Sequence, residues 1–418
     1  MNKQWNYFDD LTSRLLFATD ASAYREIPAA VFFPESNEDI RDIIEHAGNK
    51  GTSIIPRGAG TSLAGQVVGS GIVVDISRHM NRIPELNRSE KWVKVEPGVI
   101  LSELNQYLEP YGLFFGPETS TANRCTIGGM VGNNACGLHS IIYGSTRDHL
   151  LAVKAILSNG SEAEFKALTR EEFEKKCTGN SLENKIYQNI KTILSNPENA
   201  EEIRSQYPDP EIPRRNTGYA LDLMLESALF SSSAAPFNFC KLLAGSEGTL
   251  AFITEITLSL VDLPPKEKTM ICPHFHSVDE ALRANLIALK YHPAAVELMD
   301  GNIIECTKNN REQHQNRFFI EGTPGAVLLI EFYGTVQQKI TALKEEMQST
   351  GLGYAFPVIR NEDIKKAWNL RKAGLGLLSN MPGKGKTVSF VEDTAINVNR
   401  LPDYIRDFQK ILDKYNQQ

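Results

Sequence analysis

Three glycine-rich segments constrain this sequence more than any other feature. They span residues 56–66, 126–137 and 245–254. Glycine lets backbone N–H groups come close to a ligand, and consecutive amides of this kind form concave anion-binding sites. Each segment alone could be turn chemistry at the end of a strand. Together, the three predict a fold in which they line one extended ligand that contains a diphosphate.

The first glycine-rich segment fits neither of the familiar phosphate-binding loops. The dinucleotide fingerprint G-x-G-x-x-G matches Gly58 and Gly60 but requires glycine where Leu63 stands. A P-loop would run from Gly60, but Gln66 occupies the position that requires lysine. A P-loop NTPase is therefore disfavoured, and the ligand has to be inferred from the three segments as a set.

Composition sets the protein class. The chain has 418 residues, of which 41% are hydrophobic and 23% charged, as in ordinary globular proteins, and at roughly 100–200 residues per domain it predicts two or three domains. The net charge of −7 gives no basic field for nucleic acid, so we expect none to bind. No apolar run approaches the roughly 18 residues of a membrane span, and residues 1–10 resemble neither a signal nor a transit peptide. These features predict a cytoplasmic protein.

The six cysteines are scattered and form no C-x-x-C pair. Zinc and iron–sulfur sites need clustered thiolates, so neither is expected from the cysteines of this stretch. We expect buried free thiols instead.

The N-terminal part of the chain alternates helical and strand patterns. Ser36 and Asp39 form a capping box ahead of an apolar helical face, and Gly51 is placed to end that helix. Short apolar runs predict strands, and one amphipathic helix follows them. The predicted strands cover residues 53–55, 72–75 and 92–95, and the helix covers residues 100–108.

A charged, glycine-poor segment over residues 164–240 predicts a helical insertion. Its most regular helix is expected to share one apolar face among Leu182, Ile186, Ile190 and Ile193. A strand with alternating apolar residues follows over residues 252–260. Pro264 and the next proline end that strand and mark the predicted domain boundary.

After this boundary, the pattern reads β-α-β…β-α-β, which predicts a ferredoxin-like sheet with helices on one face. The expected strands cover residues 269–275, 295–299, 327–333 and 354–359, and the helices cover residues 278–290 and 336–348. A long helix over residues 362–379, a strand over 387–396 and a last helix over 401–415 complete the prediction.

The glycine-rich set, together with the Pro-Glu-Thr-Ser-Thr stretch at residues 117–121, resembles the FAD-linked oxidoreductases of the vanillyl-alcohol-oxidase superfamily. The D-2-hydroxy-acid dehydrogenase branch, with D-lactate, glycolate and D-2-hydroxyglutarate dehydrogenases, is the most similar. Further similar stretches are residues 76–82, 104–108, 217–219, 296–300 and 390–395. The resemblance implies an α+β protein. A two-lobed PCMH-type FAD-binding domain would cover residues 1–263, and a ferredoxin-like cap domain, incomplete at its C-terminus, would cover residues 264–418.

The same resemblance implies noncovalent FAD, because Thr61 stands where relatives with covalent flavin carry histidine. The backbone amides expected to hold the pyrophosphate are those of Arg57, Gly58, Ala59, Gly60, Thr61, Ser62 and Leu63. The residues expected along the flavin and ribityl chain are Pro117, Thr121, Thr126, Gly128, Gly129, Asn133 and Gly137. Those expected around the adenine are Glu247, Gly248 and Ile253.

A 2-hydroxy acid presents a carboxylate, which a fixed cation, preferably an arginine with a bidentate contact, would bind. Arg371 matches the family position for this role, although the residues alone favour an exposed helix arginine. Lys386 is a second candidate, for a distal carboxylate. Tyr219 is expected either to approach the flavin or to pack as a structural residue. The adjacent acids at 392 and 393 would face opposite sides of a strand, which argues against a catalytic pair.

The implied activity is oxidation of a D-2-hydroxy acid to the 2-oxo acid, with hydride passed to flavin N5. Family members continue beyond residue 415 into G-H-x-x-x-G-x-x-H and E-H-G stretches that supply metal ligands and a general base, and this sequence ends before either. Zinc or another divalent metal is therefore expected only in the complete enzyme, and an iron–sulfur cluster only in a fused downstream part. His79 and His139 lie in family motifs and are expected to be hydrogen-bonded structural residues. The sequence predicts FAD binding with weak or absent turnover.

The expected partners are a small 2-hydroxy acid and an electron acceptor reached through a downstream iron–sulfur part, a quinone or another carrier. Membrane association through that acceptor and self-association both stay open. One alternative is another flavoprotein of the superfamily, such as an alditol oxidase or an FAD/NADPH cell-wall reductase. The other is a noncatalytic nucleotide-binding domain.

Overall fold

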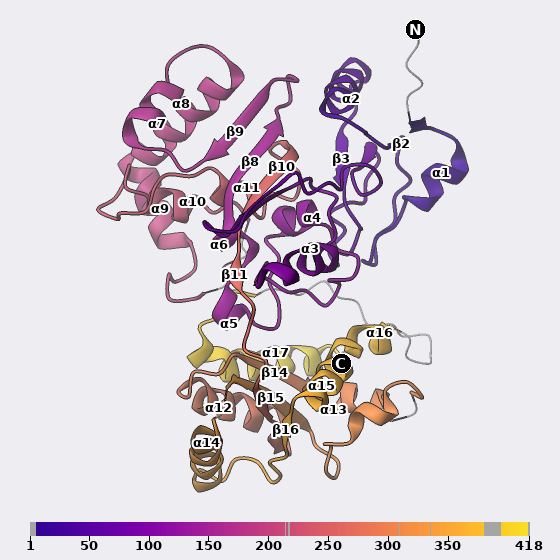
Figure 1. Cartoon of the computed structure of the whole chain (residues 1–418), viewed down its shortest axis with the longest axis vertical. Helices are drawn as coiled ribbons and strands as arrows, with labels where there is room; N and C mark the ends of the chain where they lie inside the picture. Colours follow the sequence, from indigo (N-terminus) through magenta and orange to yellow (C-terminus); the bar gives the residue numbers. More distant parts are fainter. Residues whose placement is uncertain are drawn as a thin grey trace.

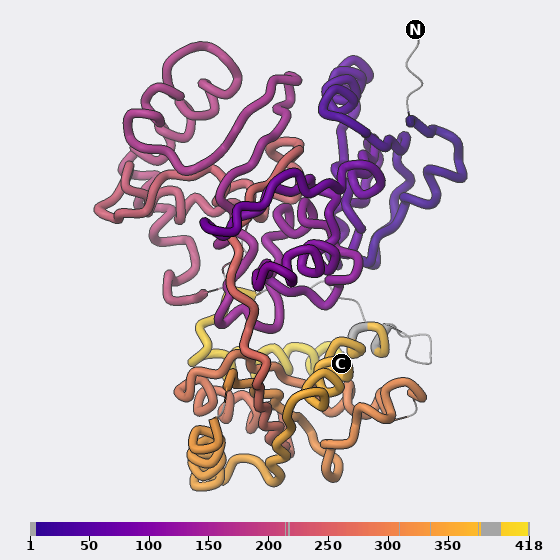
Figure 2. The backbone as a smooth tube through the Cα atoms, viewed as in Figure 1, coloured from indigo at the N-terminus to yellow at the C-terminus, as the bar shows by residue number. Residues whose placement is uncertain are grey.

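The computed structural model describes residues 6–213, 215, 218–308, 310–334, 336–379 and 394–416. Two bodies are stacked along the long axis of the molecule (Figure 1), and the chain passes from one to the other just after β11 (Val261–Asp262). The tube view shows this crossing as a single extended segment (Figure 2). Within the described part of the chain, no helix is long and apolar enough to cross a bilayer.

The first lobe is a small sheet that carries the first glycine-rich segment at its end. Its strand order is β1-β2-β4-β3, with β2 and β3 parallel to β4. The strands are β1 (Tyr7–Phe8), β2 (Ala30–Phe32), β3 (Ile54–Arg57) and β4 (Ile72–Asp75). Helix α2 (Asn37–Lys50) covers the sheet, and Ser36 caps it by accepting a hydrogen bond from the Asp39 amide. Gly51 ends α2 at φ 64°, as the sequence predicts.

The second lobe is built on a five-stranded antiparallel sheet with the order β5-β6-β10-β8-β9. Its strands are β5 (Glu85–Asn87), β6 (Trp92–Val95), β8 (Leu150–Ile156), β9 (Glu162–Lys166) and β10 (Phe252–Ser259). Every second residue of β10 is buried, which confirms the predicted alternation. Helices α3 (Leu101–Leu108) and α4 (Ile127–Asn133) pack into the same core. Strand β10 comes after the insertion at residues 164–240 in the sequence, yet it forms the central strand of this sheet.

The insertion is helical, as predicted, but its buried face differs. Its helices are α7 (Arg170–Lys176), α8 (Leu182–Ser195), α9 (Pro197–Gln206) and α10 (Leu221–Leu225), and α11 (Cys240–Leu243) follows at its end. Ile193 on α8 is 41% exposed, whereas Tyr187, Ile190 and Leu194 are buried. The ring of Tyr187 packs against the rings of Phe173 and Phe239, and this aromatic cluster fixes the rotation of α8.

The cap domain contains an antiparallel sheet in which β16, β12, β15 and β14 follow one another, with the short β13 (His274–Phe275) also beside β15. This is the strand order of a ferredoxin-like sheet. The strands are β12 (Lys268–Ile271), β14 (Ala295–Asp300), β15 (Ala326–Tyr333) and β16 (Val358–Arg360).

The two helices of the predicted β-α-β pattern lie on one face of the cap sheet, and further helices cover its other face. Helices α12 (Val278–Leu289) and α14 (Gln337–Ser349) share one core with β15, while α13 (Gly301–Cys306) and α15 (Glu362–Lys372) share another. The other face is covered because the run from Ala326 to Ile330 on β15 is apolar and buried on both sides. An apolar strand of this kind has to be covered on each face.

Several predicted boundaries are corrected. The strand expected over residues 269–275 is divided into β12 and β13, and Pro273, which cannot donate a ladder hydrogen bond, lies between them. The long helix breaks at Ala373 into α15 and α16 (Gly374–Ser379). Residues 380–393, which hold most of the strand predicted over 387–396, lie outside the described residues, and α17 (Leu401–Lys414) follows. All six cysteines are free thiols, but those at 136, 177 and 306 are only half-buried.

Candidate functional site

The three glycine-rich segments meet around two adjoining hollows in the FAD-binding part predicted from the sequence. Both hollows share the lining residues Gly58, Ser62, Val67, Gly129 and Asn133. The space inside them, open solvent included, is about 670 Å³ and 990 Å³. The joined space therefore suits one long ligand better than one compact ligand.

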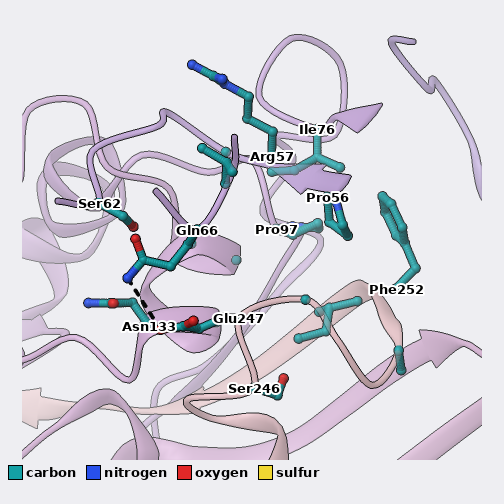
Figure 3. Close-up of a pocket in the computed structure, with 18 residues that line it drawn as sticks. Pro56, Arg57, Ser62, Gln66, Ile76, Pro97, Asn133, Ser246, Glu247 and Phe252 are labelled. Carbon is teal, nitrogen blue, oxygen red and sulfur yellow. Dashed lines mark hydrogen bonds between the residues drawn. The ribbon is translucent and has the colours of Figure 1, made fainter. Parts of the chain in front are cut away.

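The first hollow is closed by the third glycine-rich segment. Figure 3 shows Ser62, Gln66, Asn133 and Glu247 converging on one side of it, and Gln66 Nε2 donates to Glu247 Oε1 at 3.3 Å. Glu247 and the glycine after it both have positive φ, 51° and 75°. Two successive left-handed residues make a sharp turn, which carries this segment across the end of the first one.

The second hollow lies between the first and second glycine-rich segments. Thr126 caps α4 by accepting a hydrogen bond from the Gly129 amide at 3.2 Å. A Cβ on Gly58 would lie 2.2 Å from Thr126 Oγ1, so only glycine allows these two segments to approach this closely. Among the described residues that line this hollow there is no lysine or arginine. A bound diphosphate would therefore be held by backbone N–H groups and hydroxyls.

Arg57 is the exception among the predicted site residues, because its side chain leaves the hollow that its chain segment lines (Figure 3). The guanidinium donates to the carbonyls of Thr19 at 2.8 Å and Phe17 at 3.3 Å, and it lies over the Phe17 ring. Burial lowers its pKa, although Asp75 and Asp20 act in the opposite direction. Arg57 thus fastens the N-terminal segment to the first glycine-rich segment, a link that sequence reasoning missed.

The structure brings most of the predicted cofactor residues to these hollows. The first hollow includes Arg57, Gly58, Ser62, Gly128, Gly129, Asn133, Glu247, Gly248 and Ile253. The second includes Gly58, Ala59, Gly60, Thr61, Ser62, Leu63, Thr121, Thr126, Gly129 and Asn133. Pro117 and Gly137 are not among the lining residues, whereas Gln66, Pro97, Phe252, Thr119 and Cys136 are and were missed. Two adjoining hollows lined by close glycine approaches and hydroxyl groups fit FAD.

Comparison with known families supports this fit. Residues 28–166 match the FAD binding domain, and residues 264–418 match the C-terminal domain of FAD linked oxidases. The chain therefore contains both of these domain types. The two matched domains flank the helical insertion, and the glycine-rich segments at 56–66 and 126–137 lie within the first of them.

Relatives of this chain include D-2-hydroxyglutarate dehydrogenases. It is 36% identical to the protein from Pantoea ananatis and 35% identical to that from Escherichia coli, each over 96% of this chain and 40% of the relative. It is 24% identical to a glycolate oxidase subunit of Bacillus subtilis, over 98% of this chain and 74% of the relative. The chain thus spans about two fifths of the length of those dehydrogenases.

A solved alkyldihydroxyacetonephosphate synthase has the same fold. It superposes with a TM-score of 0.58 at 15% identity, over 90% of this chain and 61% of the synthase. Similarity at this level shows a shared fold and carries no argument about activity.

On the cap side, α15 presents Arg371 to a carboxylate of the neighbouring strand. Arg371 Nε and Nη2 both donate to Oε2 of Glu297 on β14, at 3.1 and 2.9 Å. The side chain of Arg371 is 34% exposed. One edge of the guanidinium is thus oriented by Glu297, and its role toward substrate stays a prediction.

Other predicted cap and insertion residues have different outcomes. Lys386 and the acids at 392 and 393 lie outside the described residues. Tyr219 is 41% exposed, and its hydroxyl lies 2.7 Å from Thr249 Oγ1, so it is attached to the third glycine-rich segment. Within the part of the chain that the structure describes, no three His, Cys, Asp or Glu side chains gather as a metal site.

Proposed function

We propose that this chain, with its FAD-binding part and its cap, is the flavoprotein portion of a dehydrogenase that oxidises a D-2-hydroxy acid to the corresponding 2-oxo acid. The observation that carries the proposal is the pair of joined hollows, lined by all three glycine-rich segments. The named activities of the relatives support the substrate class, which covers acids of the D-2-hydroxyglutarate, D-lactate and glycolate type.

When bound, FAD would supply the hydride acceptor, flavin N5. The protein has to bind and orient this cofactor. Thr61 lines the second hollow and its hydroxyl offers no route to the histidyl link of covalent flavoproteins, so we propose that the cofactor is held noncovalently. Backbone N–H groups of residues 57–63 would take the diphosphate charge.

Arg371 would bind the substrate carboxylate. Glu297 Oε2 takes the Nε–H and one Nη2–H, which leaves the second Nη2–H and both Nη1–H groups as donors at the end of the planar guanidinium. A guanidinium held in this way loses less freedom when a carboxylate binds, which favours orientation of the reacting carbon. Lys386 would bind a second, distal carboxylate, as a dicarboxylic 2-hydroxy acid would require.

Electrons would leave through an acceptor, for which we propose a downstream iron–sulfur part, a quinone or another carrier. Relatives named as cytochrome-linked D-lactate dehydrogenases, from Arabidopsis thaliana and Saccharomyces cerevisiae, support transfer to an external acceptor. A cytoplasmic location, with membrane contact only through that acceptor, and self-association are further proposals.

The test begins with the visible absorbance spectrum of the purified chain, which should be that of bound oxidised flavin. Released cofactor should be FAD, and denaturation should free it without proteolysis. Under anaerobic conditions, D-2-hydroxyglutarate, D-lactate or glycolate should bleach the oxidised flavin band only slowly, in keeping with the weak turnover expected of this chain. The L-enantiomers of the chiral acids should not bleach it. An Arg371→Lys variant should keep its flavin and lose most of the bleaching. A colourless chain that also fails to bind added FAD would overturn the proposal.

A further inference from the structure

A buried histidine joins the two bodies of the molecule. His139 lies at the start of α5 (Ser140–Tyr143) in the FAD-binding part. Its Nδ1 is 2.7 Å from Glu118 Oε2, and its Nε2 is 3.1 Å from Oε1 of Glu331, which lies on β15 of the cap. The side chain of His139 is 7% exposed and that of Glu331 is fully buried. The imidazole therefore bridges a carboxylate of each body.

The contacts of His139 determine its protonation. Carboxylate oxygens only accept hydrogen bonds, and a neutral imidazole has a single N–H, so two carboxylate contacts require the imidazolium with both nitrogens donating. Burial alone would lower the pKa of His139, but the hydrogen bonds and charges of the two carboxylates raise it to about 9.

Other charged and titratable groups face the cluster formed by Glu118, His139 and Glu331. Lys268 on β12 lies 3.2 Å from Glu331, and the charge of Lys372 on α15 acts on Glu118. The hydroxyls of Tyr143 on α5 and Tyr333 on β15 lie 3.3 Å apart beside the imidazole. The imidazolium and Lys268 thus balance the two carboxylates, as a buried cluster requires.

The same cluster reaches the helix that carries Arg371. Trp368 Nε1 donates to Glu331 Oε2 at 2.6 Å, and Trp368 precedes Arg371 by three residues on α15. Positions three apart lie on one side of a helix. The hydrogen bond from Trp368 to Glu331 therefore fixes the rotation of α15 and its position along the helix axis at this turn. Glu331 is in turn bound by His139 of the other body.

At the opposite end, the cluster reaches the cofactor hollow. Glu118 precedes Thr119, Ser120 and Thr121, which line the second hollow. A Cβ on Gly137 would lie 1.1 Å from the carbonyl oxygen of Glu118, so this backbone is packed directly against the end of the second glycine-rich segment. Movement of Glu118 relative to the hollow is therefore restricted.

We propose that His139 is a positioning residue, which as an imidazolium fastens the cap to the FAD-binding part. Through Glu331 and Trp368, it sets where Arg371 stands relative to the cofactor hollow. The ligand whose binding depends on this placement is the carboxylate of a 2-hydroxy or 2-oxo acid. That last step rests on the proposed function, whereas the fastening of the two bodies does not.

The first experiment measures ligand affinity in the FAD-loaded full chain carrying His139→Gln. The probes are 2-oxoglutarate, pyruvate and glyoxylate, titrated against the flavin absorbance spectrum. The dissociation constant of the 2-oxo acid should rise about ten- to a hundredfold, as small misplacements of a positioning group do, while that of FAD stays within about twofold. The matched control is His274→Gln. His274 is also a buried histidine but lies within the cap, and its two nitrogens contact backbone groups of Cys272 and Glu321 instead of carboxylates.

A pH series separates positioning from general stability. In the wild-type chain, 2-oxo acid affinity should fall as the pH rises toward and through about 9, where the imidazolium loses its proton. The His139→Gln chain should lack this fall in affinity, because a glutamine at position 139 has no proton to lose near pH 9. A parallel fall in both chains would assign the effect to other groups, such as Lys268, and would overturn the proposal.

Hydrogen exchange tests the fastening independently of the ligand. Amides of residues 362–372 should exchange faster in His139→Gln than in wild type, and Glu118→Gln, a milder change at a 40% exposed side chain, should act in the same direction. If no 2-oxo acid perturbs the wild-type flavin but exchange increases, the proposed function fails and the fastening stands. Unchanged exchange in both variants, with wild-type affinity, overturns the inference.

Discussion

The cofactor hollow and the junction around His139 are built in opposite ways. In the hollow, backbone and small side chains from three distant segments form the walls, and the arginine of the first segment points away. At the junction, charged side chains from both bodies are buried together, with Glu331 fully inaccessible. A backbone-lined site is sensitive to added atoms, whereas a buried charged cluster is sensitive to lost charge. The two regions should therefore respond to different substitutions.

The largest effect is expected from His139→Ala. Removing one partner of a buried ion pair leaves the other uncompensated, and such changes cost about 3–5 kcal/mol of unfolding free energy. Urea denaturation, followed by tryptophan fluorescence, would measure the loss, because Trp368 contacts Glu331 at the junction. A loss below about 1 kcal/mol would show that the ion pairs of His139 contribute no more unfolding free energy than an exposed ion pair does. The junction would then not differ from the cofactor hollow in the way described.

The next effect is the pH dependence of the junction. The pKa of His139 is raised from 6.5 to about 9, so its contribution is complete below pH 6.5 and is lost as the pH rises toward 9. The pKa values of Glu118 and Glu331 are lowered despite their burial, so their contributions are lost as the pH falls below 4.5. The stability difference between wild type and His139→Gln should be largest between these limits and should shrink at pH 9. A difference that grows with pH would contradict this assignment.

A smaller effect is expected in the hollow from Gly58→Ala. The added Cβ would lie 2.2 Å from Thr126 Oγ1, and overpacking of this kind costs about 1–3 kcal/mol. FAD affinity should fall about tenfold or more, since each 1.4 kcal/mol corresponds to a factor of ten. Isothermal titration with FAD would measure it. Gly48→Ala on α2 is the control, because its Cβ would meet nothing within 4 Å and helix propensity favours alanine.

The smallest effect is expected from Arg41→Gln. Arg41 forms an ion pair with Glu162, and both side chains are exposed, at 42% and 56%. Exposed pairs contribute about 0–1 kcal/mol and weaken with salt. Thermal melting should therefore change little, and still less at high ionic strength. A loss as large as that of His139→Ala would mean that burial does not explain the contrast.

Much of the fold follows from local patterns. The cap and C-terminal glycine of α2, the alternation of β10 and the strand order of the cap sheet all match the patterns that predict them. The errors arise where packing decides between faces. Helix α8 rotates to bury Tyr187 in an aromatic cluster, so that Ile193 is exposed.

The sequence by itself determined the glycine-lined hollow, because the need for a close backbone approach is encoded in the residue type at each position. Thus Gly58 can be identified before its neighbour Thr126 is known. The tertiary structure alone decided which way Arg57 points and which carboxylates His139 meets. Glu118 and Glu331 are 213 residues apart in the chain and carry no shared local pattern. Only the packing of one body on the other brings them to the two nitrogens of one imidazole.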